Sequence, residues 1–149
     1  MNIADLTRRA ESGSCVAQTT LGLVYLYGDA PVDIDYGKAL RFLSMAAEQG
    51  ASRAIANLGD MYLNGLGTAR NVSKAIQLYE QVGKLEFFAA LELGRIYASG
   101  MGVPVDARKA LEWYSVALSF AKEDFDCDAL AEELSEAKDY VERRIGEPT

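Results

Sequence analysis

The sequence contains no histidine, only two cysteines and three prolines, and a single tryptophan among its 149 residues. Without histidine, neither a Ser-His-Asp nor a Cys-His catalytic arrangement can form, and the commonest zinc ligand is missing. No Cys-x-x-Cys pair occurs either, which argues against a structural zinc site. We therefore expect no metal and no cofactor.

Long hydrophobic runs are also absent. No apolar stretch approaches the roughly 20 residues that a membrane-spanning helix requires. The first nine residues carry one acid and two bases and lack the apolar core of a signal peptide. These features predict a cytoplasmic protein that does not bind a membrane.

Motifs for nucleophilic or phosphate chemistry are scarce. No Walker-type phosphate loop occurs, and the two Gly-x-Gly turns lack the third glycine of a dinucleotide-binding loop. Two Ser-x-x-Lys stretches, Ser119 to Lys122 and Ser135 to Lys138, match one element of β-lactam-hydrolysing enzymes. The companion Ser-Asp-Asn and Lys-Thr-Gly elements are missing, so we predict no catalytic residues. A Ser-dependent hydrolase remains the alternative of another class.

The chain is rich instead in one internal repeat. A Leu-Gly pair is followed by Tyr three residues after the Gly, by a second Gly three residues later, and by Lys-Ala about ten residues further on. The three copies begin at Leu21, Leu58 and Leu93, and their first glycines lie 37 and 35 residues apart. Periods of this length are typical of stacked helical hairpins rather than of one central core.

Each repeat predicts two helices. The first, called the A helix, is expected over residues 14–27, 51–64 and 86–99, and the second, the B helix, over residues 36–49, 72–82 and 107–120. The glycines Gly28, Gly65 and Gly100 fall just past the A helices, where a left-handed cap favours glycine. Glycine inside a helix costs about 1 kcal/mol, so we expect Gly22, Gly59 and Gly94 to let the B helix approach closely. Asp35, Asn71 and Asp106 are the expected N-caps of the B helices.

The whole chain, residues 1–149, is predicted to form one domain. Its expected parts are an N-terminal half-repeat cap (1–12), three repeats (13–50, 51–83 and 84–120) and a C-terminal capping helix (126–146). The capping helix is suggested by an apolar stripe at three-and-four spacing, Ala129, Leu130, Leu134, Ala137, Tyr140, Val141 and Ile145. The recurring aromatics Tyr25, Tyr62, Tyr97, Phe42, Trp113 and Tyr114 are expected in the core.

The repeat resembles that of the Sel-one-like repeat (SLR) family of the tetratricopeptide-like superfamily. The resemblance covers residues 13–120 and rests on the Gly-x-Gly loops at Gly65 and Gly100, the helix signature from Asp106 to Tyr114, and the repeat ending Ala46–Gly50. The loop after Gly28 and the pair Val82-Gly83 depart from that pattern. The resemblance implies an all-α, right-handed α/α solenoid of about three helix-turn-helix repeats that acts as a scaffold for other proteins, often in bacteria.

Cysteine placement and charge constrain the partners. Cys15 and Cys127 lie near opposite ends of the expected array, too far apart for a disulfide, and are predicted to be free thiols. The net charge is −7, and residues 121–149 hold ten of the 22 acids against four of the 15 bases. Such an end repels nucleic acid and could attract a basic protein, but we favour the simpler interpretation of a solvated end-cap that keeps the array soluble.

The A helices are expected to line the concave face of the solenoid. Side chains there that packing does not require are the candidate contacts to a partner protein or peptide: Leu23, Leu26, Tyr27, Arg53, Asn57, Asp60, Asn64, Phe88 and Arg95. Apolar and aromatic side chains at repeat 1 would anchor the partner, while the polar side chains would orient it. In the alternative interpretation, the leucines pack against the N-terminal cap and the charges form solvated pairs.

The resulting prediction is a non-enzymatic protein-binding adaptor that is monomeric when free. A more specific version is a cytosolic immunity-type protein that neutralises a basic bacterial toxin by binding it. A self-assembling structural unit is the remaining alternative.

Overall fold

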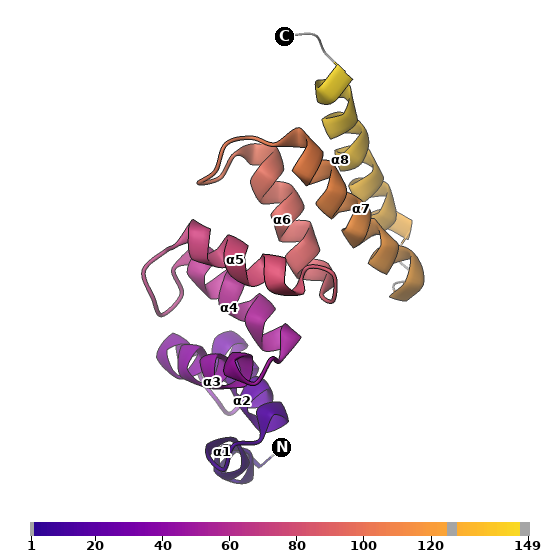
Figure 1. The fold of residues 1–149 in the computed structure, drawn as a ribbon. Coiled ribbons are helices and arrows are strands. Elements are labelled where there is room, and N and C mark those ends of the chain that lie inside the picture. Colours follow the sequence, from indigo (N-terminus) through magenta and orange to yellow (C-terminus); the bar gives the residue numbers. More distant parts are fainter. Residues whose placement is uncertain (1, 125–127, 147–149) are drawn as a thin grey trace. The chain divides into compact units, whose positions relative to one another are not determined.

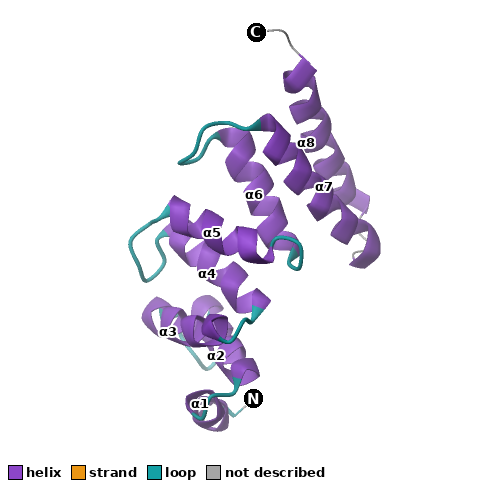
Figure 2. Ribbon diagram, in the orientation of Figure 1, coloured by secondary structure: helices purple, strands orange, loops and turns teal. Residues whose placement is uncertain are grey.

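The computed structural model describes residues 2–124 and 128–146, with side chains described except at residues 121–131 and 133. Within these ranges the chain forms eight helices and no strand (Figures 1 and 2). They are α1 (Ile3–Glu11), α2 (Cys15–Tyr27), α3 (Tyr36–Glu48), α4 (Ser52–Asn64), α5 (Val72–Val82), α6 (Phe87–Ser99), α7 (Ala107–Asp124) and α8 (Asp128–Gly146). The all-α class is confirmed.

The chain forms two compact units, residues 1–78 and 79–149, and each is described by itself. The division falls within α5. The right-handed sense of the solenoid and the single domain of residues 1–149 stay predictions.

The A helices are α2, α4 and α6, and the B helices are α3, α5 and α7. The A helices end where the glycine pattern predicts, because Gly28, Gly65 and Gly100 have φ values of 71°, 69° and 72°. In each case the glycine N–H donates to a carbonyl four residues earlier, which closes the last turn.

One arrangement of Tyr, N-cap residue and Lys links the two helices of every repeat. The N–H of the N-cap residue donates to the Tyr carbonyl at 2.8, 2.8 and 2.9 Å, in the pairs Asp35–Tyr25, Asn71–Tyr62 and Asp106–Tyr97. The N-cap side chain accepts the Lys N–H at 2.9, 2.9 and 3.0 Å, from Lys38, Lys74 and Lys109. The three Lys ammonium groups then lie 4.9, 5.4 and 4.8 Å from the Tyr ring centroids. The predicted N-caps are confirmed.

Only part of the predicted aromatic core is buried. Tyr97 is 6% exposed and Phe42 is 3% exposed, whereas Tyr25 and Tyr62 are half-buried. Tyr114 is also buried, at 6% exposure, and Trp113 is half-buried. Full burial is thus wrong for Tyr25, Tyr62 and Trp113, although Tyr25 packs against both core clusters of the first unit and stacks on Phe42.

In the first unit, the apolar core is built between α2, α3 and α4. Leu43 and Met61 are fully buried there, and the half-buried Leu23 packs against the same cluster. A second cluster joins α1 to α2 and α3 through Leu6, Leu21 and Phe42, among others.

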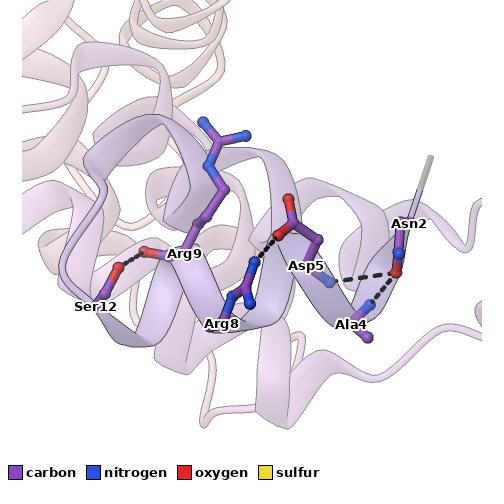
Figure 3. A network of polar contacts seen from close by, with 6 residues as sticks. All are labelled: Asn2, Ala4, Asp5, Arg8, Arg9 and Ser12. Carbon is purple, nitrogen blue, oxygen red and sulfur yellow. Dashed lines mark hydrogen bonds and ion pairs between the residues drawn. The ribbon is translucent and has the colours of Figure 1, made fainter.

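Helix α1 has polar caps of its own (Figure 3). The Asn2 side chain accepts the N–H groups of Ala4 and Asp5, and Asp5 pairs with Arg8 one turn later. At the other end, the Ser12 hydroxyl donates to the Arg9 carbonyl at 2.9 Å. These contacts hold both ends of α1, which lets its apolar face cover α2.

In the second unit, α7 packs against both α6 and α8. Leu134 and Val141 of α8 are buried, as the apolar stripe predicts, but Tyr140 and Ile145 are 57% and 40% exposed. The side chains of Ala129 and Leu130 lie outside the described residues. Cys15 is a free thiol, and Cys127 also lies outside the described residues.

Candidate partner-binding site

Tyr27 joins two of the A helices. It is the last residue of α2 and is 66% exposed, yet its hydroxyl donates to Asn57 Oδ1 of α4 at 2.9 Å. The Asn57 amide nitrogen in turn donates to the Arg53 carbonyl at 2.7 Å. Because both ends of the Asn57 amide are engaged, the Tyr27 ring is held in one position on an exposed surface.

Burial and a neighbouring carboxylate raise the pKa of Tyr27. Burial raises the pKa of Tyr27 above its usual value, the nearby Asp60 carboxylate raises it further, and Arg53 opposes the rise. Tyr27 therefore stays a neutral hydrogen-bond donor near pH 7.

The remaining predicted residues of α4 continue the same surface. Asn64 donates from its side chain to the Asp60 carbonyl at 2.9 Å and is exposed. Arg53, at the start of α4, is exposed, and the ion pairs found among the described residues do not include it. Hydrogen bonds thus link the Tyr27 hydroxyl to the Asn57 side chain, and the Asn57 side chain to the backbone carbonyl of Arg53.

Leu26 is a correction to the predicted contact set. It is 5% exposed and belongs to the core cluster with Leu58 and Met61 of α4. The alternative interpretation placed the leucines against the N-terminal cap. Leu26 instead belongs to the cluster of α2, α3 and α4, and Leu23 packs against that cluster rather than against the one that includes α1. Leu23 is half-buried and presents only part of its surface.

Phe88 and Arg95 belong to the second unit. Phe88 is 65% exposed and meets the buried Phe87 edge-on, with ring centroids 5.1 Å apart. Arg95 pairs with Glu92 at 2.8 Å on the surface of α6. The interpretation as a solvated ion pair describes Arg95 well.

The Ser-x-x-Lys stretches show no nucleophile–base contact among the described residues. The Ser119 hydroxyl donates to the Val116 carbonyl at 2.6 Å, and Ser135 is exposed on α8. The Lys138 ammonium nitrogen lies 3.9 Å from Oε1 of Glu142. The Lys122 side chain lies outside the described residues.

Within the described part of the chain, no group of three His, Cys, Asp or Glu is placed to hold a metal, and no helix is long and apolar enough to cross a membrane.

Two polar features were missed by the sequence argument. Gln18 is 2% exposed; it donates to the Ala10 carbonyl at 3.0 Å and accepts from Gln49 at 2.7 Å. A cavity of about 310 Å³ lies between α1 and α2, beside the 71%-exposed Val16 and the guanidinium of Arg9. In Figure 3 the interactions of Asp5 are with Arg8 and Asn2, and none is drawn to the Arg9 guanidinium. Gln18 begins the polar run Gln18-Thr19-Thr20, and nothing in that run distinguishes the buried Gln18 from the two threonines.

Comparison with known proteins adds the family to this geometry. Residues 15–50, 52–84 and 88–119 match the sequence model of the Sel1 repeat. The chain belongs to the Sel1 repeat family. Sel1 repeat proteins generally act as protein–protein interaction modules and are typically non-catalytic. The matched stretches agree with the helical hairpins α2–α3, α4–α5 and α6–α7.

Solved structures support the same assignment. One is a Sel1 repeat protein from Oxalobacter formigenes, with 27% sequence identity and a TM-score of 0.74. The match covers 80% of this chain and 91% of the Oxalobacter chain. The protein c5321, a protective antigen present in uropathogenic Escherichia coli strains and displaying an SLR fold, matches 94% of this chain over 33% of its own. Its identity is 28% and its TM-score 0.75.

Two curated relatives come from rodents. The mouse protein DAP3-binding cell death enhancer 1 is 35% identical over 80 residues, and its rat counterpart is 36% identical over 76 residues. The matches cover 54% and 51% of this chain but only 15% and 14% of those proteins. This Sel1 repeat chain thus corresponds to a small part of each relative.

Proposed function

We propose that this Sel1 repeat chain binds a partner protein through the α2–α4 face, defined as Leu23, Tyr27, Arg53, Asn57, Asp60 and Asn64. The observation that carries the proposal is Tyr27, a large aromatic ring that is two-thirds exposed and yet tied to Asn57 by its hydroxyl. The names of the rodent relatives, which record binding of another protein, DAP3, support a protein as the partner class.

The Tyr27 side chain is preorganised for binding. Binding normally costs the freedom of each side chain that becomes ordered, roughly 0.5–1.5 kcal/mol for a rotamer-rich one. The Tyr27 hydrogen bond has already restricted this ring, so little of that cost remains. Tyr and Arg are the residue types that most often dominate interface energies, and Arg53 lies one turn before Asn57 on the same helix.

The face carries charges of both signs, Arg53 and Asp60, so it favours a partner with complementary polar groups over a uniformly basic one. A basic partner such as a toxin would instead suit α8, on which Glu136, Asp139 and Glu142 are exposed. The two surfaces lie in different units, which allows an experiment to separate them.

Site-specific photo-crosslinking tests the proposal. A photoreactive phenylalanine is placed at position 64, which is exposed on the α2–α4 face and leaves Tyr27 intact, at position 36 on the B helix of repeat 1, and at position 139 on α8. We expect a discrete crosslinked protein in native cell extract from position 64 and none from position 36. Crosslinks from position 139 alone would move the site to the acidic helix and overturn the proposal.

Tyr27→Phe sharpens the test. It keeps the ring but removes the hydrogen bond to Asn57. We expect it to weaken binding of the crosslinked protein by about threefold to tenfold, or roughly 1 kcal/mol, because the freed ring must then be ordered when the partner binds. Unchanged binding would mean that fixing the ring contributes nothing.

A further inference from the structure

A second cavity lies entirely within the second unit. It has a volume of about 190 Å³ and forms between the end of α6, the α6–α7 loop and α8. Its lining residues are Ala98, Val105, Ala107, Tyr140, Val141 and Arg144.

The walls of this cavity are mostly apolar. Val141 is 3% exposed, and Ala98 and Ala107 are half-buried. Val105 and Tyr140 are 61% and 57% exposed, although both are large and apolar. Exposed apolar side chains gathered at a cavity are characteristic of binding surfaces. The volume is below the roughly 300–1,000 Å³ of pockets that hold drug-sized ligands, so it suits one side chain.

Among the described residues that line the cavity, Arg144 alone is charged. One of its terminal nitrogens donates to the Tyr140 hydroxyl at 3.2 Å, and its guanidinium carbon lies 5.7 Å from the centroid of that ring. Tyr140 thus positions the guanidinium while using only one of its five N–H donors. The ion pair recorded among the described residues of α8 joins Lys138 to Glu142 and does not include Arg144.

The acids Asp139 and Glu142, which lie nearest to Arg144 along α8, are on other faces of the helix, and Glu136 lies two turns before Arg144 and does not line the cavity. Residues 140, 141 and 144 follow three-and-four spacing and share one face of the helix, the face that lines the cavity. Asp139 and Glu142 fall outside that spacing and are not among the lining residues. The cavity therefore presents an arginine within an apolar surface, although the chain as a whole carries a net charge of −7.

We propose that this cavity binds a segment of a partner protein in which a bulky apolar side chain lies next to a carboxylate. The apolar side chain fills the space between Val105 and Val141, and the carboxylate accepts two hydrogen bonds from Arg144. Charge complementarity supports this occupant, because the contacts of the guanidinium among the described residues are with a hydroxyl and an aromatic ring rather than with a carboxylate. The site is distinct from the α2–α4 face, and either can fail without the other.

An NMR titration tests the proposal with defined probes. The isotopically labelled full chain is titrated with the capped dipeptide acetyl-Leu-Glu-amide, with the neutral acetyl-Leu-Gln-amide, and with sodium acetate. We expect the first probe to shift the backbone amides of Ala98, Val105 and Val141 and the side-chain N–H of Arg144. The neutral dipeptide and acetate should each bind at least about fivefold more weakly, because each lacks one of the two contacts.

Arg144→Gln is the test variant, and Arg143→Gln is its matched control. Arg143 precedes it on the same helix, carries the same charge, and directs its Nε–H to the Asp139 carbonyl instead of lining the cavity. We expect Arg144→Gln to weaken acetyl-Leu-Glu-amide binding about fivefold or more, and Arg143→Gln to change it less than twofold. Equal effects of the two variants, equal binding of acetate and the dipeptide, or no shift at the cavity amides would each overturn the proposal.

Discussion

The same glycine position meets different neighbours in the two units. A Cβ added at Gly22 of α2 would lie 2.6 Å from Cγ of Leu43, whereas one added at Gly94 of α6 would lie 2.6 Å from the ring of Tyr114. Both glycines belong to the repeated Leu-Gly pair, and both neighbours come from the B helix of the same repeat. The repeat therefore requires a close approach of its two helices, while a branched aliphatic or an aromatic side chain can fill the contact.

The comparison extends to the exposed sides of α2 and α6. The buried sides of these helices share the Leu-Gly-x-x-Tyr frame, but their exposed sides carry Tyr27 in one and Phe88 with Arg95 in the other. Packing restricts the residues of the Leu-Gly-x-x-Tyr frame and leaves the exposed residues free to vary. This is the physical reason that a repeat family can keep one fold and bind different partners.

The largest effect on this comparison is expected from Gly94→Ala. The new methyl group would overlap a rigid, buried ring, and overpacking of this kind costs about 1–3 kcal/mol. Alanine regains up to about 1 kcal/mol of helix propensity, so we expect the free energy of unfolding of the second unit to fall by about 2 kcal/mol. Urea denaturation followed by circular dichroism measures it; unchanged or higher stability would contradict the close approach.

Gly22→Ala should have a smaller effect in the same direction, about 1 kcal/mol. Its neighbour Leu43 is a flexible side chain that can move, although the backbone nitrogen of Leu43 at 3.2 Å limits the relief. Gly37→Ala on α3 is the control, because the nearest atom to its added Cβ is the Asp35 carboxylate oxygen at 3.4 Å. We expect no loss of stability there. If Gly22→Ala were as harmless as Gly37→Ala, the shared role of Gly22 and Gly94 would be wrong.

The N-caps provide a third, smaller comparison between repeats. Asn71→Ala removes the acceptor of the Lys74 N–H and should lower the unfolding free energy by about 1 kcal/mol at any pH between 4 and 8. Hydrogen-exchange rates of the first-turn amides of α5 report this loss locally. Exchange rates equal to those of the unmodified protein would show that the cap does not stabilise α5.

Asp35 occupies the same position in repeat 1 but titrates. The hydrogen bond from the Lys38 backbone N–H, together with the Lys38 ammonium at 3.3 Å, holds the pKa of Asp35 below its usual value. A lowered pKa means that Asp35 stabilises the fold at neutral pH and loses this contribution as the pH falls from about 4 through its folded value. Asp35→Asn should therefore weaken the acid dependence of stability between pH 6 and 3. If the free energy of unfolding of Asp35→Asn fell with decreasing pH as steeply as that of the unmodified chain, this role of Asp35 would be contradicted.

Much of the fold could be predicted from the sequence because its signals are local. A glycine at a left-handed cap such as Gly65, or an N-cap such as Asp106, depends on the backbone within a few residues of itself. The helix bounds follow from these caps, and they agree with the predicted bounds to within one residue for five of the six repeat helices. Helix α7 begins at the predicted residue 107 but continues to Asp124, four residues beyond the predicted end at 120.

The contacts between repeats could not be predicted in the same way. Leu26 is buried in a cluster that joins its own hairpin, α2 and α3, to helix α4 of the next repeat, so its surroundings depend on the stacking of repeats. The hydrogen bond from Tyr27 to Asn57 joins residues 30 positions apart, and no local pattern signals it. The cavity at Arg144 likewise depends on three segments that come together only in the folded unit.

The most direct test of the account is a quantitative affinity pull-down from native cell extract with three baits: the unmodified chain, Tyr27→Ala/Arg53→Ala and Tyr36→Ala. Tyr36 is 36% exposed on the B helix of the same repeat and controls for loss of an exposed tyrosine. We predict one partner protein that the unmodified and Tyr36→Ala baits retain equally and that the double variant loses by more than tenfold. Equal recovery by all three correctly folded baits would contradict binding through the α2–α4 face.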